Sequence, residues 1–249
     1  MMFDRRAVLL GLLSCPICAS LARAAEGSHW SYEGADGPAQ WGELDPAFKT
    51  CAVGTQQSPV DLKGAIKADF GHLEFDWKPQ AFALVNNGHT IQAHAKPGSF
   101  ARVAGETYAL QQFHFHAPSE HAINGARTAM EVHFVHAGPG GRYAVVGALM
   151  KSGATNAAFG AIMAAAPRSP GDGALHRPID PRQLVPAKSD IYRYAGSLTT
   201  PPCSEVVDWN VYARPIDVAA GDIAAFHALY PMNARPLQPL NRRFVLIGH

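Results

Sequence analysis

Two short segments of the sequence place histidines at spacings that could bind a metal ion. One is Gln112-Phe113-His114-Phe115-His116, and the other is Glu131-Val132-His133-Phe134-Val135-His136. Side chains alternate between the faces of a β-strand, so His114 and His116 share one face while the two phenylalanines take the other. If the segments are neighbouring strands with these faces aligned, His133 joins the pair. Three neutral nitrogen ligands and a water form an open catalytic zinc site.

Each segment also carries a hydrogen-bond acceptor two residues before a candidate ligand. A zinc-bound histidine needs its second ring nitrogen held by an acceptor, which fixes the orientation and tautomer of the ring. Gln112 is placed to serve His114 in this way, and Glu131 is placed to serve His133. One H-x-H pair in a strand is weak evidence, because most such histidines are structural. Two such segments with their acceptors predict a zinc centre.

The elements that must position these residues are mainly strands. Apolar or alternating runs predict strands at residues 82–85, 90–94, 111–116, 130–136, 143–149, 206–212 and 244–247. Helical periodicity is scarce, and residues 156–166 and 219–230 are its best candidates. We expect one mainly β domain over residues 25–249, with a few short helices and a large, mostly antiparallel sheet.

The composition is that of an ordinary soluble globular chain, with 47% hydrophobic and 16% charged residues. The 21 basic residues nearly balance the 20 acidic ones. Nucleic acids and anionic membranes bind concentrated basic faces, so the charge pattern predicts neither kind of partner.

The first 24 residues are typical of an export signal. Arg5 and Arg6 precede a mostly apolar stretch, residues 7–21, and Ala22-Arg23-Ala24 resembles a signal-cleavage site. The stretch is too short for a membrane span and lacks the polar face of an amphipathic helix. The arginine pair favours twin-arginine export, and Leu12-Leu13-Ser14-Cys15 resembles a lipoprotein signal, so the route stays open between these and general secretion. We predict a periplasmic or secreted protein.

Cysteine positions agree with export. Cys15 and Cys18 lie within the predicted signal, which leaves Cys51 and Cys203 in the mature chain. Two cysteines in an oxidising compartment are expected to pair, so we predict a disulfide. Two buried free thiols are the alternative.

Further phrases accompany the histidine segments along the chain: Trp30-Ser31-Tyr32, Gln57-Ser58-Pro59-Val60-Asp61, Asn86-Asn87-Gly88-His89, Ser119-Glu120-His121, Ser197-Leu198-Thr199-Thr200-Pro201-Pro202-Cys203, Trp209, and Asn233 followed by Arg235. Together with the histidines they resemble the alpha-class carbonic anhydrases, in the order of that family and over almost the whole mature chain. The resemblance implies a twisted sheet with one zinc ion at the bottom of a conical cleft. It also implies an exported bacterial enzyme, monomeric or homodimeric, that reversibly hydrates carbon dioxide to bicarbonate and a proton.

The resemblance implies a role for each matching residue. His114, His116 and His133 would bind the zinc. Thr199 would accept a hydrogen bond from the zinc-bound hydroxide that attacks carbon dioxide. Its own hydroxyl would donate to Glu120, because an ionised carboxylate can only accept hydrogen bonds. The substrate would meet an apolar wall formed by Val135, Val145, Leu198 and Trp209. The polar side of the cleft would be formed by Thr199, Thr200 and Gln112.

His89 would pass the released proton to solvent, beside cleft residues Tyr32, Asn87 and Gln92. A histidine suits this task because its ordinary pKa, about 6.5, lies near the operating pH. Without the resemblance, the residues around His89 favour an ordinary solvent-exposed histidine that follows a turn. His94 shares a strand face with Gln92 and is a second candidate at the rim.

Two other classes of protein fit parts of the pattern. His114-Phe115-His116 followed by Glu120 matches a cupin metal motif, but Gly138-Pro139-Gly140-Gly141 downstream lacks the histidine that a cupin needs. A catalytically inactive relative acting as a binding module is the second alternative, and such proteins usually lose a zinc ligand. All three candidate ligands are present here, which favours the enzyme.

Overall fold

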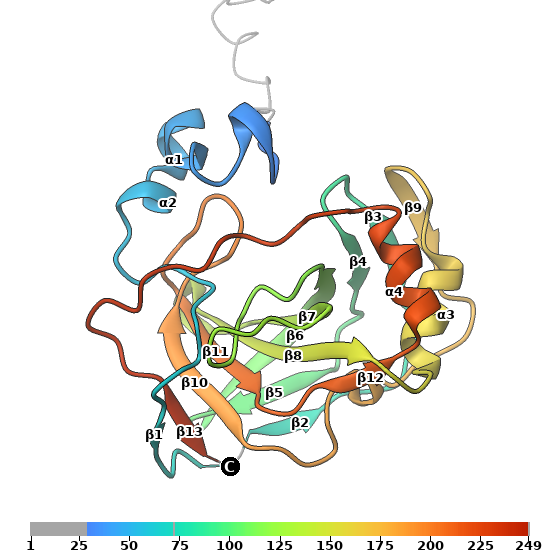
Figure 1. The fold of residues 1–249 in the computed structure, drawn as a ribbon. Coiled ribbons are helices and arrows are strands. Elements are labelled where there is room, and N and C mark those ends of the chain that lie inside the picture. The colour runs from blue at the N-terminus through green and yellow to red at the C-terminus, as the bar shows by residue number, and fades with distance from the viewer. Residues whose placement is uncertain (1–28, 72, 249) are drawn as a thin grey trace, which may run out of the picture.

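One 13-stranded sheet organises the computed structural model, which describes residues 29–71 and 73–248 (Figure 1). The strands are β1 (Ile66–Lys67), β2 (Glu74–Asp76), β3 (Ala83–Asn86), β4 (Ile91–His94), β5 (Phe100–Val103), β6 (Glu106–His116), β7 (Met130–Ala137), β8 (Tyr143–Ser152), β9 (Gly171–Ala174), β10 (Ile191–Gly196), β11 (Val207–Tyr212), β12 (Ile216–Val218) and β13 (Leu246–Gly248). Their spatial order is β1-β13-β10-β11-β8-β7-β6-β4-β3-β9, with β12 beside β8 and with β5 joining β2 to β6.

Helices are few and short among the described residues. They are α1 (Trp41–Leu44), α2 (Thr50–Val53), α3 (Ala157–Ala165) and α4 (Ala220–His227), with 3₁₀ turns at Gly34–Asp36, Pro46–Phe48, Pro139–Gly141 and Pro181–Leu184. Asn156 caps α3, because its side chain accepts a hydrogen bond from the Phe159 N–H. No helix in the described part is long and apolar enough to cross a membrane. The predicted signal, residues 1–24, lies outside the described residues.

The predicted fold class is confirmed, and the differences include strands that the sequence did not predict, among them the six-residue β10. The sheet is mixed but mostly antiparallel, with parallel pairs only at β1–β13, β8–β11 and β8–β12 among the described strands. The last strand begins at Leu246 rather than Phe244, whose side chain is 71% exposed. Sequence reasoning missed β9, because Gly171-Asp172-Gly173-Ala174 has no side-chain pattern and pairs with β3 through its backbone.

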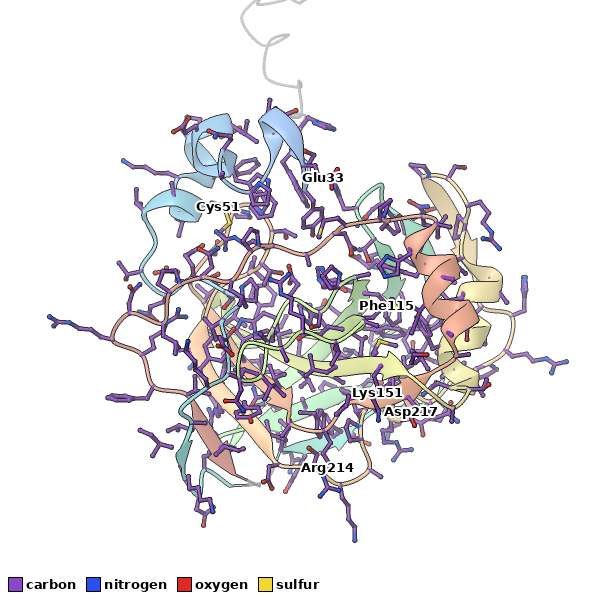
Figure 2. The ribbon with its side chains drawn as sticks, in the orientation of Figure 1. Glu33, Cys51, Phe115, Lys151, Arg214 and Asp217 are labelled. Carbon is purple, nitrogen blue, oxygen red and sulfur yellow. A yellow bond between two sulfur atoms is a disulfide. The ribbon has the colours of Figure 1, made fainter. Side chains whose placement is uncertain are left out.

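The two faces of β6 and β7 have different surroundings. Phenyl and aliphatic side chains from one face enter the main core and are fully buried, namely Phe113, Phe115, Val132 and Phe134. Figure 2 labels Phe115 between the sheet and the helical side of the molecule, where its ring meets Phe159 of α3 and Phe226 of α4 at 5.1 and 6.2 Å between centroids. Burying such side chains stabilises the fold by about 1.5–3 kcal/mol each, and strand alternation then turns the histidines to the opposite face.

A bulge in β6 sets which face the histidines take. The pairing with β7 shifts between Leu110 and Gln112, so Gln111 is the extra residue. Leu110 and Phe113 consequently both face the main core, although an unbroken strand would place them on opposite faces. The bulge therefore directs Gln112, His114 and His116 together, away from the core.

His136 shows how a histidine serves structure alone. It lies three residues beyond His133 and so faces the main core, where Trp77 Nε1 donates to its Nε2 at 3.0 Å. Its Nδ1 donates to the Phe134 and Ala144 carbonyls at 3.0 and 3.2 Å. Burial lowers the pKa of His136 to about 4, so the ring is neutral at physiological pH.

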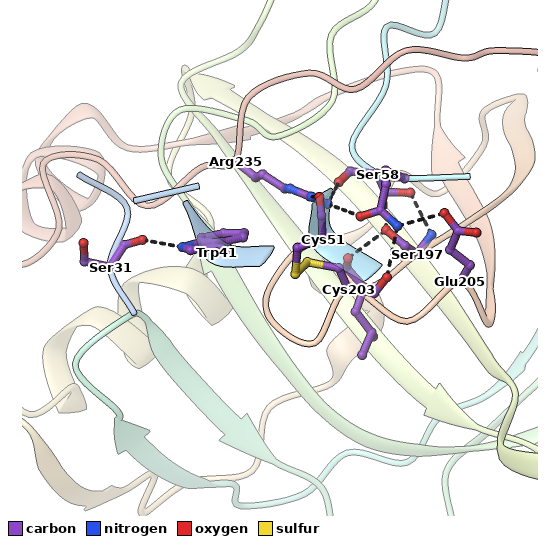
Figure 3. The surroundings of a disulfide bond; sticks show 10 residues. Ser31, Trp41, Cys51, Ser58, Ser197, Cys203, Glu205 and Arg235 are labelled. Atoms are coloured by element: carbon purple, nitrogen blue, oxygen red, sulfur yellow. Dashed lines mark hydrogen bonds between the residues drawn. A yellow bond between two sulfur atoms is a disulfide. The ribbon is translucent and has the colours of Figure 1, made fainter. Parts of the chain in front are cut away.

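A disulfide joins the N-terminal segment to the loop that follows β10. Cys51 of α2 is bonded to Cys203, which confirms the predicted pair. The guanidinium of Arg235 supports the bridge, because it donates to the Cys51 carbonyl at 3.1 Å and to the Ser58 carbonyl at 2.8 Å and lies over the Trp41 ring (Figure 3). The bridge and the arginine thus hold the N-terminal helices against the loop that carries Thr199.

Replacing both cysteines with serine should lower the free energy of unfolding by about 3–5 kcal/mol, because the bridge closes a loop of 152 residues in the unfolded chain. Urea unfolding of the double variant and the oxidised parent measures this difference. Peptide mapping without reductant should recover Cys51 and Cys203 in one linked pair. Two alkylated thiols in the exported protein, or equal stabilities, would contradict the prediction.

Candidate metal centre

The three predicted ligands lie together on β6 and β7. His114 and His133 are directly opposite in the antiparallel register, and His116 is one strand repeat away. Their potential ligand atoms all lie within 4.8 Å of one another. His116 and His133 are each 1% exposed, while His114 is partly exposed, so the group opens toward solvent on the His114 side.

Each ring is held through the nitrogen that faces away from the group. Gln112 Oε1 accepts from His114 Nδ1 at 2.8 Å, as the sequence predicts. His116 Nδ1 donates to the main-chain carbonyl of Asn233 at 2.7 Å, a partner with no local sequence signal. An acceptor on Nδ1 fixes the proton there and leaves Nε2 of both rings as a lone pair.

In His133 the acceptor lies beside Nε2, whereas in the other two rings it lies beside Nδ1. Its Nε2 lies 3.0 Å from Glu131 Oε1, although the two groups are not aligned well enough for a full hydrogen bond. This contact directs Nε2–H to the carboxylate and leaves Nδ1 as the lone pair. Burial alone would raise the pKa of Glu131, but His121 and His133 outweigh it and hold that pKa well below its usual range, so the carboxylate stays ionised.

The residues present fit a metal cation. Desolvation, reinforced by the neighbouring histidines, lowers the pKa of His114 well below its ordinary value, and desolvation also lowers that of His116. Both rings are therefore neutral, as metal binding requires. His116 Nε2 is also buried without a hydrogen-bond partner among the described residues, a cost that a metal ion would remove.

A second group of residues could also hold a metal: His121, Glu131 and His133. In that group His121 and Glu131 already have hydrogen-bond partners. His121 donates to Glu131 through Nδ1 at 2.7 Å and through its backbone N–H at 2.8 Å, and its Nε2 lies 2.6 Å from the Tyr194 hydroxyl. His121 and Glu131 are therefore committed to hydrogen bonds, and His114, His116 and His133 form the better metal site.

Glu120 is fully buried at the edge of the histidine group. Its Oε1 accepts from the Arg235 backbone N–H at 2.8 Å. Its Oε2 has no hydrogen-bond partner in the described part of the chain and lies 3.6 Å from His116 Nε2. The expected bond from the Thr199 hydroxyl is not among the hydrogen bonds of the described residues, so that pairing remains a prediction. Thr199 itself is 6% exposed.

The residues predicted to form the apolar wall do lie together. Val135, Val145 and Trp209 are buried in one cluster, and Leu198 packs against it. The Trp209 ring also meets His133 at 4.8 Å between centroids, and its Nε1 donates to the Ser197 carbonyl at 2.9 Å. Thr200, Gln112 and Gln92 are partly exposed. Gln92 is opposite His114 in the β4–β6 register.

His89 occupies a tight turn that the sequence indicated. The Asn87 side chain accepts from the His89 and Thr90 backbone N–H groups at 2.9 Å each, and Gly88 takes φ 84°. The imidazole stacks on Trp30 with centroids 3.8 Å apart, and Tyr32 meets it edge-on at 6.4 Å. Partial burial, and secondarily His29, lower the pKa of His89. His94 is exposed and contacts Gln92 at 3.1 Å.

Asn233 links the two parts of the site. While its carbonyl holds His116, its side-chain NH₂ donates to the His89 and Phe115 carbonyls at 2.9 Å each, and its Oδ1 accepts from the Ala117 N–H at 2.7 Å. Sequence reasoning matched Asn233 to a pattern but gave it no role, since its partners are more than 100 residues away.

The sheet and the three-histidine group define a β protein with a candidate metal site, and comparisons with known proteins identify its family. The family model of eukaryotic-type carbonic anhydrases matches residues 36–248. A carbonic anhydrase from Nostoc sp. is 41% identical over 236 residues, which cover 92% of this chain and 89% of that relative. The solved complex of the alpha carbonic anhydrase from Thermovibrio ammonificans with the inhibitor sulfanilamide is 41% identical, has a TM-score of 0.86, and covers 88% of this chain and 99% of that one.

The chain therefore belongs to the alpha carbonic anhydrases. It is an enzyme, a carbonate dehydratase of the lyase class, whose family reaction is the hydration of carbon dioxide. The cupin alternative is thereby wrong, and the three candidate ligands favour the enzyme over an inactive relative of the family.

Replacing His116 with alanine should abolish stoichiometric zinc binding, because it removes one of three converging lone pairs. Glu131→Gln should retain the site but weaken zinc binding by about 10- to 100-fold. Zinc content after dialysis and competition with a chelator measure both effects, and His94→Ala on neighbouring β4 is the control. Full zinc content in His116→Ala would remove that residue from the site.

Proposed function

We propose that the chain catalyses the hydration of carbon dioxide with one zinc ion bound by His114, His116 and His133, and with His89 as the proton shuttle. One observation carries the metal assignment: three ring nitrogens converge within 4.8 Å while partners hold the opposite nitrogens. In such a site zinc supplies Lewis acidity that lowers the pKa of a bound water to about 7, as it does in carbonic anhydrases generally.

Glu120 and Thr199 orient the nucleophile in this proposal. Glu120 Oε1 is committed to the Arg235 N–H, which leaves Oε2 to accept the proton of the Thr199 hydroxyl. Once that proton is committed, the Thr199 oxygen can only accept, and it selects one orientation of the attacking water. Positioning of this kind lowers the barrier because less freedom is lost on reaching the transition state.

The apolar cluster of Val135, Val145, Leu198 and Trp209 provides the substrate side of the site. Carbon dioxide has no strong hydrogen-bonding group, so an apolar surface beside the metal admits it without competing polar contacts. Thr200, Gln112 and Gln92 line the solvent-facing side, where bicarbonate leaves and water returns.

His89 accepts the proton that each turnover releases. Its partial burial lowers its pKa from the ordinary value, so the ring is mostly neutral at pH 7 and ready to accept. The Asn87 turn and the Asn233 side chain fix its backbone, while the ring lies against Trp30 and near Tyr32. Because protonated His89 cannot accept, the shuttle should fail as pH falls through its lowered pKa.

We also propose that the protein is exported before it acts. Residues 1–24 have the pattern of a cleaved signal, and the Cys51–Cys203 disulfide is typical of an oxidising compartment. We place the mature enzyme, residues 25–249, in the periplasm or outside the cell.

Thr199→Ala should lower kcat/KM for carbon dioxide hydration by about 100-fold while zinc content stays at one per chain, because the hydroxyl positions the nucleophile and does not hold the metal. Stopped-flow hydration and metal analysis on the same samples test this. Thr199→Ser should recover most of the rate. Loss of zinc in Thr199→Ala, or an unchanged rate, would contradict the assigned role.

His89→Ala should lower kcat in weak buffer by about 10- to 100-fold and leave kcat/KM nearly unchanged, because only proton export is impaired. Added imidazole should restore kcat. His94→Ala is the matched control and should keep the parental kcat. A parental kcat for His89→Ala in weak buffer would exclude His89 as the shuttle and would direct attention to His94.

A further inference from the structure

A surface cavity of about 660 Å³ lies on the side of β10 and β11 that faces away from the metal centre. Tyr194 of β10 is opposite Trp209 of β11, and both rings belong to the buried cluster beside the candidate ligands. Because side chains alternate along a strand, Arg193 and Asp208 take the other face, where they line the cavity. No candidate zinc ligand lines it, so the cavity is separate from the metal centre.

Aromatic and aliphatic side chains form part of the lining of this cavity. Tyr143 and Phe244 contribute rings, and the side chains of Phe244 and Val206 are 71% and 37% exposed. Large apolar side chains that remain in contact with water around a cavity mark a place where a ligand can bury them. The volume also falls within the range of small-molecule sites, about 300–1,000 Å³. The cavity therefore fits a ligand with an apolar body.

Two of the arginines that line the cavity are paired with carboxylates. Arg142 donates from Nη2 to both oxygens of Glu106, at 2.7 and 2.6 Å. Arg193 donates to Asp208 from Nε at 2.9 Å and again from Nη2. In both arginines Nη1 has no acceptor among the described residues. Each pair is therefore neutral as a whole but keeps N–H donors for a ligand.

A third arginine and a glutamate of the cavity are also committed. Arg243 donates to four main-chain carbonyls, and its charge interacts with that of Glu205. Glu205 in turn accepts from the Gln56 backbone N–H at 2.6 Å and from the Gln57 side chain at 2.9 Å. Arg242 differs, since its exposed guanidinium has neither a carboxylate nor a carbonyl partner in the described part of the chain. Arg242 is therefore the uncompensated positive charge of the cavity.

We propose that this cavity binds a planar aromatic monocarboxylate, with the carboxylate at Arg242 and the ring against Phe244 and Tyr143. A guanidinium matches a carboxylate through two parallel hydrogen bonds, and an aromatic ring packs well against other rings. A neutral apolar ligand would leave Arg242 without a counter-charge. A polyanion would need more unpaired cations than the cavity holds, because Arg142 and Arg193 already have carboxylates. The proposal does not depend on the zinc function.

The cavity also adjoins both ends of the loop that carries Thr199. Gly196, the last residue of β10, lines the cavity and directly precedes that loop. Glu205 and Val206 line the cavity as well, and they directly follow the loop. A ligand in the cavity therefore contacts the base of the loop without entering the metal centre.

Titration of the zinc enzyme with 2-naphthoate, a planar aromatic monocarboxylate, tests the proposal. A carboxylate can also bind zinc, so sulfanilamide, the inhibitor in the solved Thermovibrio complex, is kept at saturation to occupy the metal centre. We expect calorimetry to give one bound 2-naphthoate per chain with a Kd of about 1 mM or tighter, as suits a ligand of this size. In ¹H–¹⁵N NMR spectra the backbone amides of residues 193–196 and 242–246 should shift.

Two exposed side chains of the cavity can be changed without disturbing the core. Arg242→Gln should weaken 2-naphthoate binding by about tenfold, because it removes the charged donor. Phe244→Ala should weaken it by about three- to tenfold, because it removes a ring contact. Arg214→Gln is the matched control, since this arginine is also exposed but lies outside the cavity (Figure 2), and it should keep the parental Kd. The uncharged amide of the same ring, 2-naphthamide, should bind the parent about tenfold more weakly than 2-naphthoate.

Three results would overturn the proposal. The first is the absence of heat and of amide shifts when 2-naphthoate is added to the sulfanilamide-bound parent. The second is displacement of sulfanilamide with no shift at residues 242–246, which would place the carboxylate at the metal. The third is a parental Kd for Arg242→Gln or Phe244→Ala, or equal binding of 2-naphthamide. The zinc content and hydration rate of the parent are measured separately, so none of these results decides the zinc function.

Discussion

Three imidazole lone pairs must converge on one point while each ring remains neutral, and the other features of the site serve this constraint. An imidazole has two nitrogens, and an acceptor on one decides that the other is free to bind a metal. Gln112, the Asn233 carbonyl and Glu131 are the three acceptors, and they come from different parts of the chain. The sheet supplies the convergence, and these acceptors supply the correct tautomers.

Maintaining such a site requires burial of polar groups, which the fold must compensate. Glu120, Glu131, His121 and Arg235 are almost fully buried, and each has hydrogen-bond partners in the described part of the chain. Burial lowers the pKa of Arg235 to about 10, although Glu120 raises it, so the guanidinium stays charged at neutral pH. The same arginine binds the disulfide segment through its side chain and Glu120 through its backbone. The N-terminal helices, the bridge and the catalytic loop are thereby parts of one network (Figure 3).

The sequence predicted the parts of the site that obey strand periodicity. His114, His116 and His133 and the acceptors Gln112 and Glu131 all follow from a repeat of two, because the phenylalanines between them must enter the core. Asn233 could not be given its role in this way, since it contacts His116 across 117 residues. The bulge at Gln111 and strand β9 were also missed, because neither produces a side-chain pattern. The family resemblance supplied roles for Glu120, Thr199 and His89 that spacing alone does not give.

The central claim is that zinc binds to three histidines and to neither buried glutamate. X-ray absorption at the zinc edge of the zinc-loaded parent protein tests it most directly. The account predicts four nitrogen or oxygen ligands at about 2.0–2.1 Å, with outer-shell scattering from three imidazoles and no sulfur. Scattering from two imidazoles with a carboxylate, as the group of His121, Glu131 and His133 would supply, would contradict the account.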